Sequence, residues 1–172
     1  MKRKSICLAI ILLWGGLSLS AQTTEPIDPY GVTAISVSGK KAYVSKPEAK
    51  VLEYPIEYTI KNALWDGSRL TAHRNGLYVV TVSFVKDSYY FNGTQDDVYV
   101  TVFKEDTSGI QTNMGFAWSG EGTGRRGTGT YTVVIELAEG EKIFTRAHCA
   151  TGKLWHLNLY NLTIYSLPTY LY

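Results

Sequence analysis

The feature that most constrains the fold of this chain is a succession of short β-type runs with no sustained helical period among them. The runs are rich in β-branched and aromatic residues, and turn signals separate them about every 8–12 residues. Clear examples are residues 32–37, 97–105, 130–138 and 142–149. This pattern predicts an all-β chain that folds as a two-sheet antiparallel sandwich of the jelly-roll type.

One run, from Leu77 to Val85, predicts a strand in the middle of a sheet. Asn75-Gly76 directly before it is a strong turn signal, because both residues tolerate positive φ. Seven of its nine residues are apolar or aromatic, and β-branched residues dominate it. We therefore expect a strand with little solvent on either face.

Two irregularities are predicted from the sequence pattern. In residues 154–167 the apolar phase changes after Leu159, so we expect an extra residue, a β-bulge, near this position. Pro55 cannot donate a ladder hydrogen bond, so residues 51–60 should form an edge strand or two separate pieces.

Residues 1–21 have the pattern of a cleaved secretory signal peptide. Lys2–Lys4 supply the positive segment, Ile6–Trp14 the apolar segment, and Ser18–Ala21 a small-residue cleavage site. A transmembrane anchor is the alternative, but the apolar run is short and Gly-Gly ends it. The pattern favours a secreted or extracytoplasmic protein.

The remainder divides into a flexible tether at 22–31 and a single jelly-roll domain at 32–172, long enough for one core. Cleavage would remove three of the 17 basic side chains and leave 14 against 15 acidic ones. No basic field for nucleic acid is then left, and no second long apolar segment predicts membrane insertion.

Cysteine usage excludes a disulfide framework. Cys7 lies in the leader, which leaves Cys149 alone in the domain. A lone cysteine can cross-link two chains or act as a nucleophile, but a small buried hydrophobic residue is the favoured interpretation.

The residues also resemble a known family. Leu70, five further positions and then Gly76-Leu77-Tyr78-Val79-Val80 are similar to the F-x5-G-x-Y-x-F motif of the C1q-like globular head domain, in the tumour-necrosis-factor-like jelly-roll superfamily. Residues 96–106, 128–147 and 161–167 resemble later strands of that family in the same order. Leu70 and Val80 replace the usual Phe, residues 159–162 replace the usual Phe-Ser/Thr-Gly-Phe, and no collagen stalk precedes the domain.

The resemblance implies a non-enzymatic interaction module that assembles as a homotrimer. In that family the Gly-x-Tyr strand lies in the middle of the sandwich, and neighbouring strands pack three protomers around a threefold axis. The residues expected in this core or trimer strand are Tyr78, Val80, Val82 and Phe84. The family often carries calcium, which makes Asp96 and Asp97 candidate ligands, although an acidic pair can simply keep a strand edge soluble.

Gly122–Gly127 matches G-x-G-x-x-G, but a dinucleotide site needs a helix after it, and here a strand-type run follows. A surface loop is the better interpretation. Arg125 and Arg126 at its tip are the most ligand-like charges in the chain, although solvated loop arginines are common.

The three histidines show no zinc-type spacing. Cys149 and His148 are neighbours in a strand and point to opposite faces, so they cannot form a nucleophile–base pair. Nothing in the sequence pairs two carboxylates as a glycosidase needs. No catalytic residue is therefore assigned.

Three tryptophans leave an alternative open. Core packing is the favoured interpretation for each of Trp65, Trp118 and Trp155, but they can also form a sugar-stacking platform. We expect a secreted, non-enzymatic C1q/TNF-like homotrimer that binds an unknown protein or glycan ligand through its loops and outer surface, with no cofactor except possible calcium. The alternative is a monomeric carbohydrate-binding jelly roll, with a secreted enzyme third.

Overall fold

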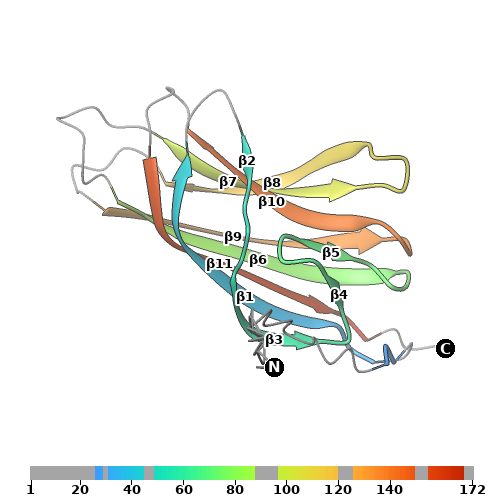
Figure 1. Ribbon diagram of the computed structural model, residues 1–172. Coiled ribbons are helices and arrows are strands. Elements are labelled where there is room, and N and C mark those ends of the chain that lie inside the picture. Colours follow the sequence, from blue (N-terminus) through green and yellow to red (C-terminus); the bar gives the residue numbers. More distant parts are fainter. Residues whose placement is uncertain are drawn as a thin grey trace, which may run out of the picture.

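The computed structural model describes residues 26–28, 31–44, 49–87, 97–119, 126–149 and 155–168. Its elements are strands throughout (Figure 1). Their bounds are β1 Ala34–Val44, β2 Lys50–Val51, β3 Ile56–Lys61, β4 Leu64–Trp65, β5 Arg69–Thr71, β6 Gly76–Asp87, β7 Val98–Glu105, β8 Gln111–Ser119, β9 Arg126–Leu137, β10 Lys142–Cys149 and β11 Trp155–Ser166. The signal peptide and most of the tether lie outside the described residues, so both stay predictions.

The strands form two antiparallel sheets that face each other. The five-stranded sheet has the order β3-β1-β11-β6-β9, and the six-stranded sheet has the order β4-β5-β10-β7-β8 with β2 paired to β10. Most neighbours within a sheet are distant in the sequence, as in a jelly roll. The predicted two-sheet antiparallel jelly roll is confirmed.

The core lies between the inner faces of the two sheets, and side-chain alternation decides which residues enter it. On β6 the inward residues are Tyr78, Val80, Val82 and Phe84, each at most 2 % exposed. From β7 opposite, Val98, Val100 and Val102 are fully buried. Cys149 on β10 is buried in this core, which agrees with its interpretation as a small hydrophobic residue.

Both predicted irregularities are present. The register of β11 against β6 shifts between Leu157 and Leu159, so Leu157 packs in the core and Leu159 points to the other face. Around Pro55 the chain is split between β2 and β3, and β3 is an edge strand. The phase of the apolar residues was therefore sufficient to locate the bulge.

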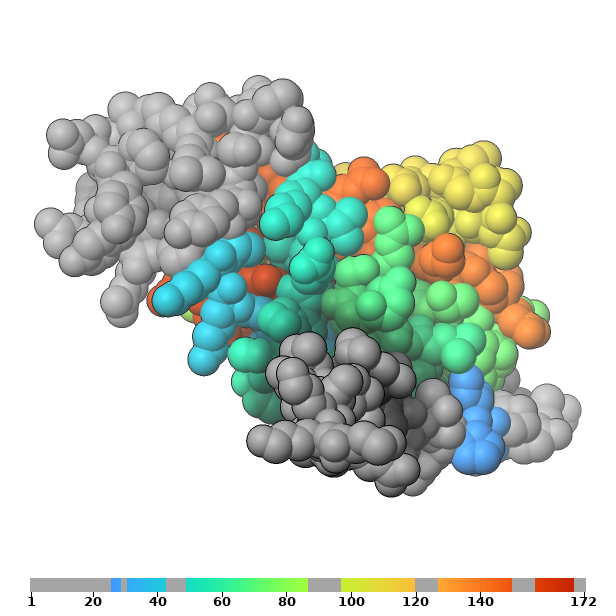
Figure 2. Space-filling model, viewed as in Figure 1, coloured from blue at the N-terminus to red at the C-terminus, as the bar shows by residue number. Residues whose placement is uncertain are grey.

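The segment between β2 and β3 closes one side of the sandwich by passing from the six-stranded to the five-stranded sheet (Figures 1 and 2). Its Tyr54 is buried, and the ring lies 5.3 Å from that of Tyr160 and 6.1 Å from that of Trp65. The Tyr54 hydroxyl shares a 2.6 Å hydrogen bond with Thr145 Oγ1, so its polar tip is satisfied inside the core. Gly39 is needed beside this cluster, because the Tyr160 ring fills the place of a Cβ.

Candidate functional site

The outer surfaces of the two sheets differ in chemistry. We call the outer surface of β3, β1, β11, β6 and β9 the five-stranded face, and its side chains follow from strand register. Its uncharged members are Ala34, Ser36, Ser38, Ile56, Thr59, Leu77, Val79, Thr81, Ser83, Val85, Thr128, Thr130, Thr132, Val134, Leu159, Asn161, Thr163 and Tyr165. Among the described side chains that the register directs to this face, the charged ones lie only at its rim, and these are Lys40, Lys61 and Glu136.

Hydroxyl groups form a continuous row across the middle of the five-stranded face. The register aligns one hydroxyl residue from each strand, and these are Thr59, Ser36, Thr163, Thr81 and Thr132. The Thr81 and Thr132 hydroxyls are 3.0 Å apart. In the next row, Asn161 Nδ2 donates to Ser83 Oγ at 3.3 Å. Some of these polar groups therefore bond to one another across neighbouring strands.

An apolar row lies beside the hydroxyl row. It consists of Ala34, Tyr165, Val79 and Val134 on four successive strands. Tyr165 is 43 % exposed and Val134 53 % exposed in the single chain, whereas Val79 is buried. The prediction of a β6 strand with little solvent on either face holds for its inner side, while on the outer side Leu77 is exposed and Thr81, Ser83 and Val85 are half-buried.

The outer surface of the six-stranded sheet, which we call the six-stranded face, is aromatic and charged. Phe103 of β7 and Phe144 of β10 are stacked, with ring centroids 5.5 Å apart and planes at 15°. Four residues further along the same strands, Tyr99 stacks on His148 at 5.0 Å. Phe116 of β8 meets the Tyr99 ring edge-on at 5.3 Å. The aromatic rings thus extend over three adjacent strands.

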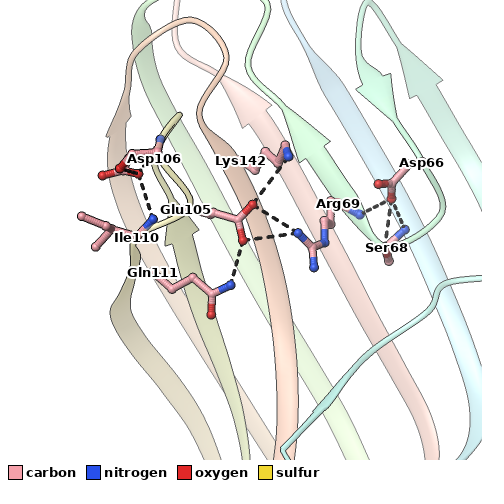
Figure 3. A network of polar contacts seen from close by, with 9 residues as sticks. Asp66, Ser68, Arg69, Glu105, Asp106, Ile110, Gln111 and Lys142 are labelled. Atoms are coloured by element: carbon pink, nitrogen blue, oxygen red, sulfur yellow. Dashed lines mark hydrogen bonds and ion pairs between the residues drawn. The ribbon is translucent and has the colours of Figure 1, made fainter.

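One carboxylate pairs with two cations at one end of the six-stranded face (Figure 3). Glu105 accepts a 2.7 Å hydrogen bond from Gln111 Nε2 and forms ion pairs with Arg69 at 3.3 Å and Lys142 at 3.5 Å. The amide bond from Gln111, and then the charges of Arg69 and Lys142, hold the pKa of Glu105 below its usual value. This end of the face is therefore a closed polar network.

A tight turn positions Arg69 in this network (Figure 3). Asp66 Oδ1 accepts hydrogen bonds from the backbone N–H groups of Ser68, at 2.9 Å, and of Arg69, at 2.7 Å. This Asx-type turn starts β5, so Arg69 leaves the strand towards Glu105. Its guanidinium carbon also lies 4.8 Å from the Phe144 ring centroid.

Arg146 differs from Arg69 because no carboxylate among the described residues pairs with it. Its guanidinium carbon lies 5.1 Å from the ring centroid of Phe103 and 5.2 Å from that of Phe144. Its Nε is buried and has no hydrogen-bond partner in the described part of the chain. The aromatic rings hold this cation in place and leave its charge uncompensated.

The residues predicted as ligand sites are not brought together by the described structure. Arg125 and Asp96 lie outside the described residues, and Arg126 starts β9 with a side chain that is not described. Because β9 is a strand, the Gly-rich segment before it is not followed by a helix, as expected. Asp97 Oδ2 accepts a 3.3 Å hydrogen bond from the Tyr99 hydroxyl, and no described group bonds its buried Oδ1.

The tryptophans are divided between core and surface. Trp65 is 8 % exposed and packs in the core, but Trp118 on β8 is 53 % exposed. Core packing, the favoured interpretation for each tryptophan, is therefore wrong for Trp118, because β8 directs it to the outer face of its sheet. The side chain of Trp155 is outside the described set.

Sequence reasoning missed Arg146, Phe116 and Tyr99 as possible site residues. The signal was the alternation of β10, which directs Phe144, Arg146 and His148 to one face. Within the described residues, no group of three or more His, Cys, Asp or Glu side chains is placed to hold a metal ion.

No model of a known protein family matches the sequence, and no curated protein matches it. Solved structures do resemble it. The globular domain of zebrafish complement 1qA superposes with a TM-score of 0.61 at 10 % identity, over 81 % of this chain and 98 % of that one. Murine APRIL gives 0.56 at 13 % identity, over 80 % and 100 %, and Eiger TNF from S. frugiperda gives 0.57 at 12 %, over 79 % and 92 %.

These similarities define the class of fold. The chain is a two-sheet antiparallel jelly roll, and more specifically it has the C1q/TNF-like jelly-roll fold. The resemblance inferred from the sequence is confirmed at this level. In the part of the chain that the structure describes, no helix is long and apolar enough to cross a membrane.

Proposed function

We propose that this chain is a secreted, non-enzymatic C1q/TNF-like binding module that acts as a homotrimer. The five-stranded face is the self-association surface, and the loops and remaining outer surface contact other molecules. The observation that carries the proposal is the uncharged centre of the five-stranded face. The fold it shares with a complement 1qA globular domain and with APRIL adds support.

The composition of the five-stranded face suits contact with protein better than contact with water. Interface centres are depleted of charged residues and enriched in aromatic ones. Here the described charges are at the rim, while Tyr165 on the central strand β11 is exposed. In its three middle rows the only lysine or glutamate among the described side chains is Lys61, on the edge strand β3.

The size of this face also suits a stable contact. Its five strands are about 4.8 Å apart, and residues on the same side of a strand are about 6.7 Å apart. Five rows of side chains on these strands therefore cover an area of roughly 700 Å². A standard interface buries about 800 Å² per partner. A closed ring of three chains needs one such face from each protomer against a different surface of the next.

Three further expectations belong to the same proposal. The chain acts without a catalytic residue, in agreement with the absence of a catalytic constellation from the sequence. Secretion depends on the predicted leader at 1–21. Calcium at Asp96 and Asp97 is a separate prediction, to which the unpartnered Oδ1 of Asp97 lends support.

The proposal is tested by measuring the solution mass of residues 22–172 by light scattering on a sizing column, with and without a calcium chelator. A mass three times that of the protomer supports the homotrimer, and a chelator-dependent mass adds the calcium site. A monomer at micromolar concentration would sink the trimer and leave the carbohydrate-binding alternative.

A further inference from the structure

The six-stranded face presents aromatic rings to solvent at one end. Trp118 is 53 % exposed and Phe116 is 47 % exposed, and both lie on β8. Next to them, Tyr99 and His148 are stacked on the same face. Exposed rings on a rigid strand offer flat apolar surface at little conformational cost.

The same face carries one cation, Arg146, that has no acidic partner in the described part of the chain. Glu105 pairs with both Arg69 and Lys142, whereas Arg146 has no carboxylate partner among the described residues. Arg146 is half-buried, and two phenylalanine rings fix its guanidinium, with a buried Nε that has no described partner. A fixed guanidinium with unused donors suits one planar carboxylate, which it can bind in a bidentate manner.

We propose that the six-stranded face binds an acidic oligosaccharide that contains uronic acids. Sugar rings stack on Phe116 and Trp118, and one sugar carboxylate pairs with Arg146. One register row contains Arg146 of β10, Thr101 of β7 and Phe116 of β8. Arg146 and Phe116 are therefore two strand spacings apart, about 10 Å. A sugar chain that runs across the strands in this row can reach both.

A single-stranded nucleic acid fits this face less well, although its bases also stack on aromatic rings. Nucleic-acid affinity comes mainly from many phosphate contacts. On the described face only Arg146 is a cation without an acidic partner, and the domain as a whole has about as many acidic as basic side chains. One cation beside stacking rings suits a ligand with sparse single charges.

A second copy of this chain also fits less well. The five-stranded face has no carboxylate in its described centre to pair with Arg146, since Glu136 lies at the rim. The ligand proposal does not rest on the trimer. A monomer that binds the acidic sugar would refute the proposed assembly and leave this inference intact.

The first test uses the unaltered purified protein and isothermal titration calorimetry. Its probes are a short oligogalacturonate, a hyaluronan oligomer, and the methyl ester of each, which keeps the rings and removes the charge. We expect at least one of the two acids to bind, and at least about tenfold tighter than its uncharged counterpart, as loss of a charge-assisted pair predicts. Failure of both acids to bind, or equal binding of acid and ester, would overturn the proposal.

The second test compares variants of the two faces. Arg146→Gln should weaken the acid about tenfold and leave the weak binding of the ester unchanged, while Trp118→Ala should weaken both about tenfold. Tyr165→Ala is the matched control, because it removes an exposed aromatic ring from the opposite face. It should leave the sugar affinity unchanged, and equal losses in all three variants would overturn the assignment.

Two further results would contradict the proposal. One is tighter binding of single-stranded DNA than of either acidic sugar at physiological salt, which would assign the face to nucleic acid. The other is loss of self-association in Trp118→Ala, which would make the face an interface between copies.

Discussion

The two outer faces of the sandwich show how one architecture can serve two kinds of contact. The five-stranded face has hydroxyl and apolar side chains in rows and charges only at its described rim. The six-stranded face has stacked rings, a neutralised carboxylate at one end and an uncompensated Arg146. Covering an uncharged face costs less desolvation free energy than covering a charged one, whereas an aromatic and cationic face gains from an anionic ligand.

Both faces depend on the same inner core. The orientation of β6 is set by its buried core residues, which are Tyr78, Val80, Val82 and Phe84. Because side chains alternate along a strand, the residues between them point outwards. The position of each outer side chain therefore follows from core packing and register. Function can change on either face without a change of fold.

The largest expected effect comes from a charge at the centre of the five-stranded face. Thr81→Arg would bury an unpaired cation in the proposed contact, and such a charge costs about 3 kcal/mol or more, about a hundredfold in association. Light scattering should then give a monomer. Phe116→Arg is the matched control on the opposite face, and it should keep the mass of the unaltered protein.

The second prediction separates the two sides of β6. Phe84→Ala empties a core site against Gly129 and should lower the free energy of unfolding by about 3–5 kcal/mol. Ser83→Ala points outwards and should change it by less than about 0.5 kcal/mol at a concentration where the chain is monomeric. Urea unfolding measures both, and equal effects would contradict the assigned alternation.

A smaller effect should come from the ionic network of the six-stranded face. Because the pKa of Glu105 is lower in the folded state, its contribution is present above the usual value near 4.5 and is lost as the pH falls through the folded pKa. Glu105→Gln should cost about 1 kcal/mol or less at neutral pH, since the pair partners are partly exposed. Below pH 4.5 the free energy of unfolding of the variant should also depend less on pH than that of the unaltered protein. An unchanged pH dependence would show that the Glu105 carboxylate does not stabilise the folded state.

The smallest effect is expected from calcium. If Asp96 and Asp97 bind calcium, a chelator should lower the midpoint of thermal unfolding by a few degrees, because the bound ion then no longer stabilises the folded state. Asp97→Asn should remove the response to the chelator. A response that survives in this variant would place the calcium elsewhere.

The residues that form the core were predictable from the sequence, whereas the arrangement of side chains on the two outer faces was not. Alternation assigns Val98, Val100 and Val102 to one face of β7 without knowledge of any other strand. The phase change after Leu159 located the bulge of β11 in the same local way.

The outer faces depend on pairing between strands that are distant in the sequence. The hydroxyl row joins residues as far apart as Ser36 and Thr163, and the environment of Arg146 comes from the pairing of β10 with β7. Neither register is encoded within a single segment. For the same reason Trp118, whose own strand has a weak pattern, was expected in the core and lies on the surface.

Hydroxyl-radical footprinting of the unaltered protein at assembly concentration tests the contrast between the faces most directly. In a single chain Tyr165 is 43 % exposed and Trp118 is 53 % exposed, so each would be oxidised at a rate that reflects its exposure and ring chemistry. The account predicts that Tyr165 is protected on the five-stranded face and becomes reactive in Thr81→Arg, while Trp118 is oxidised equally in both proteins. Equal reactivity of Tyr165 in the unaltered protein and the variant would contradict the account.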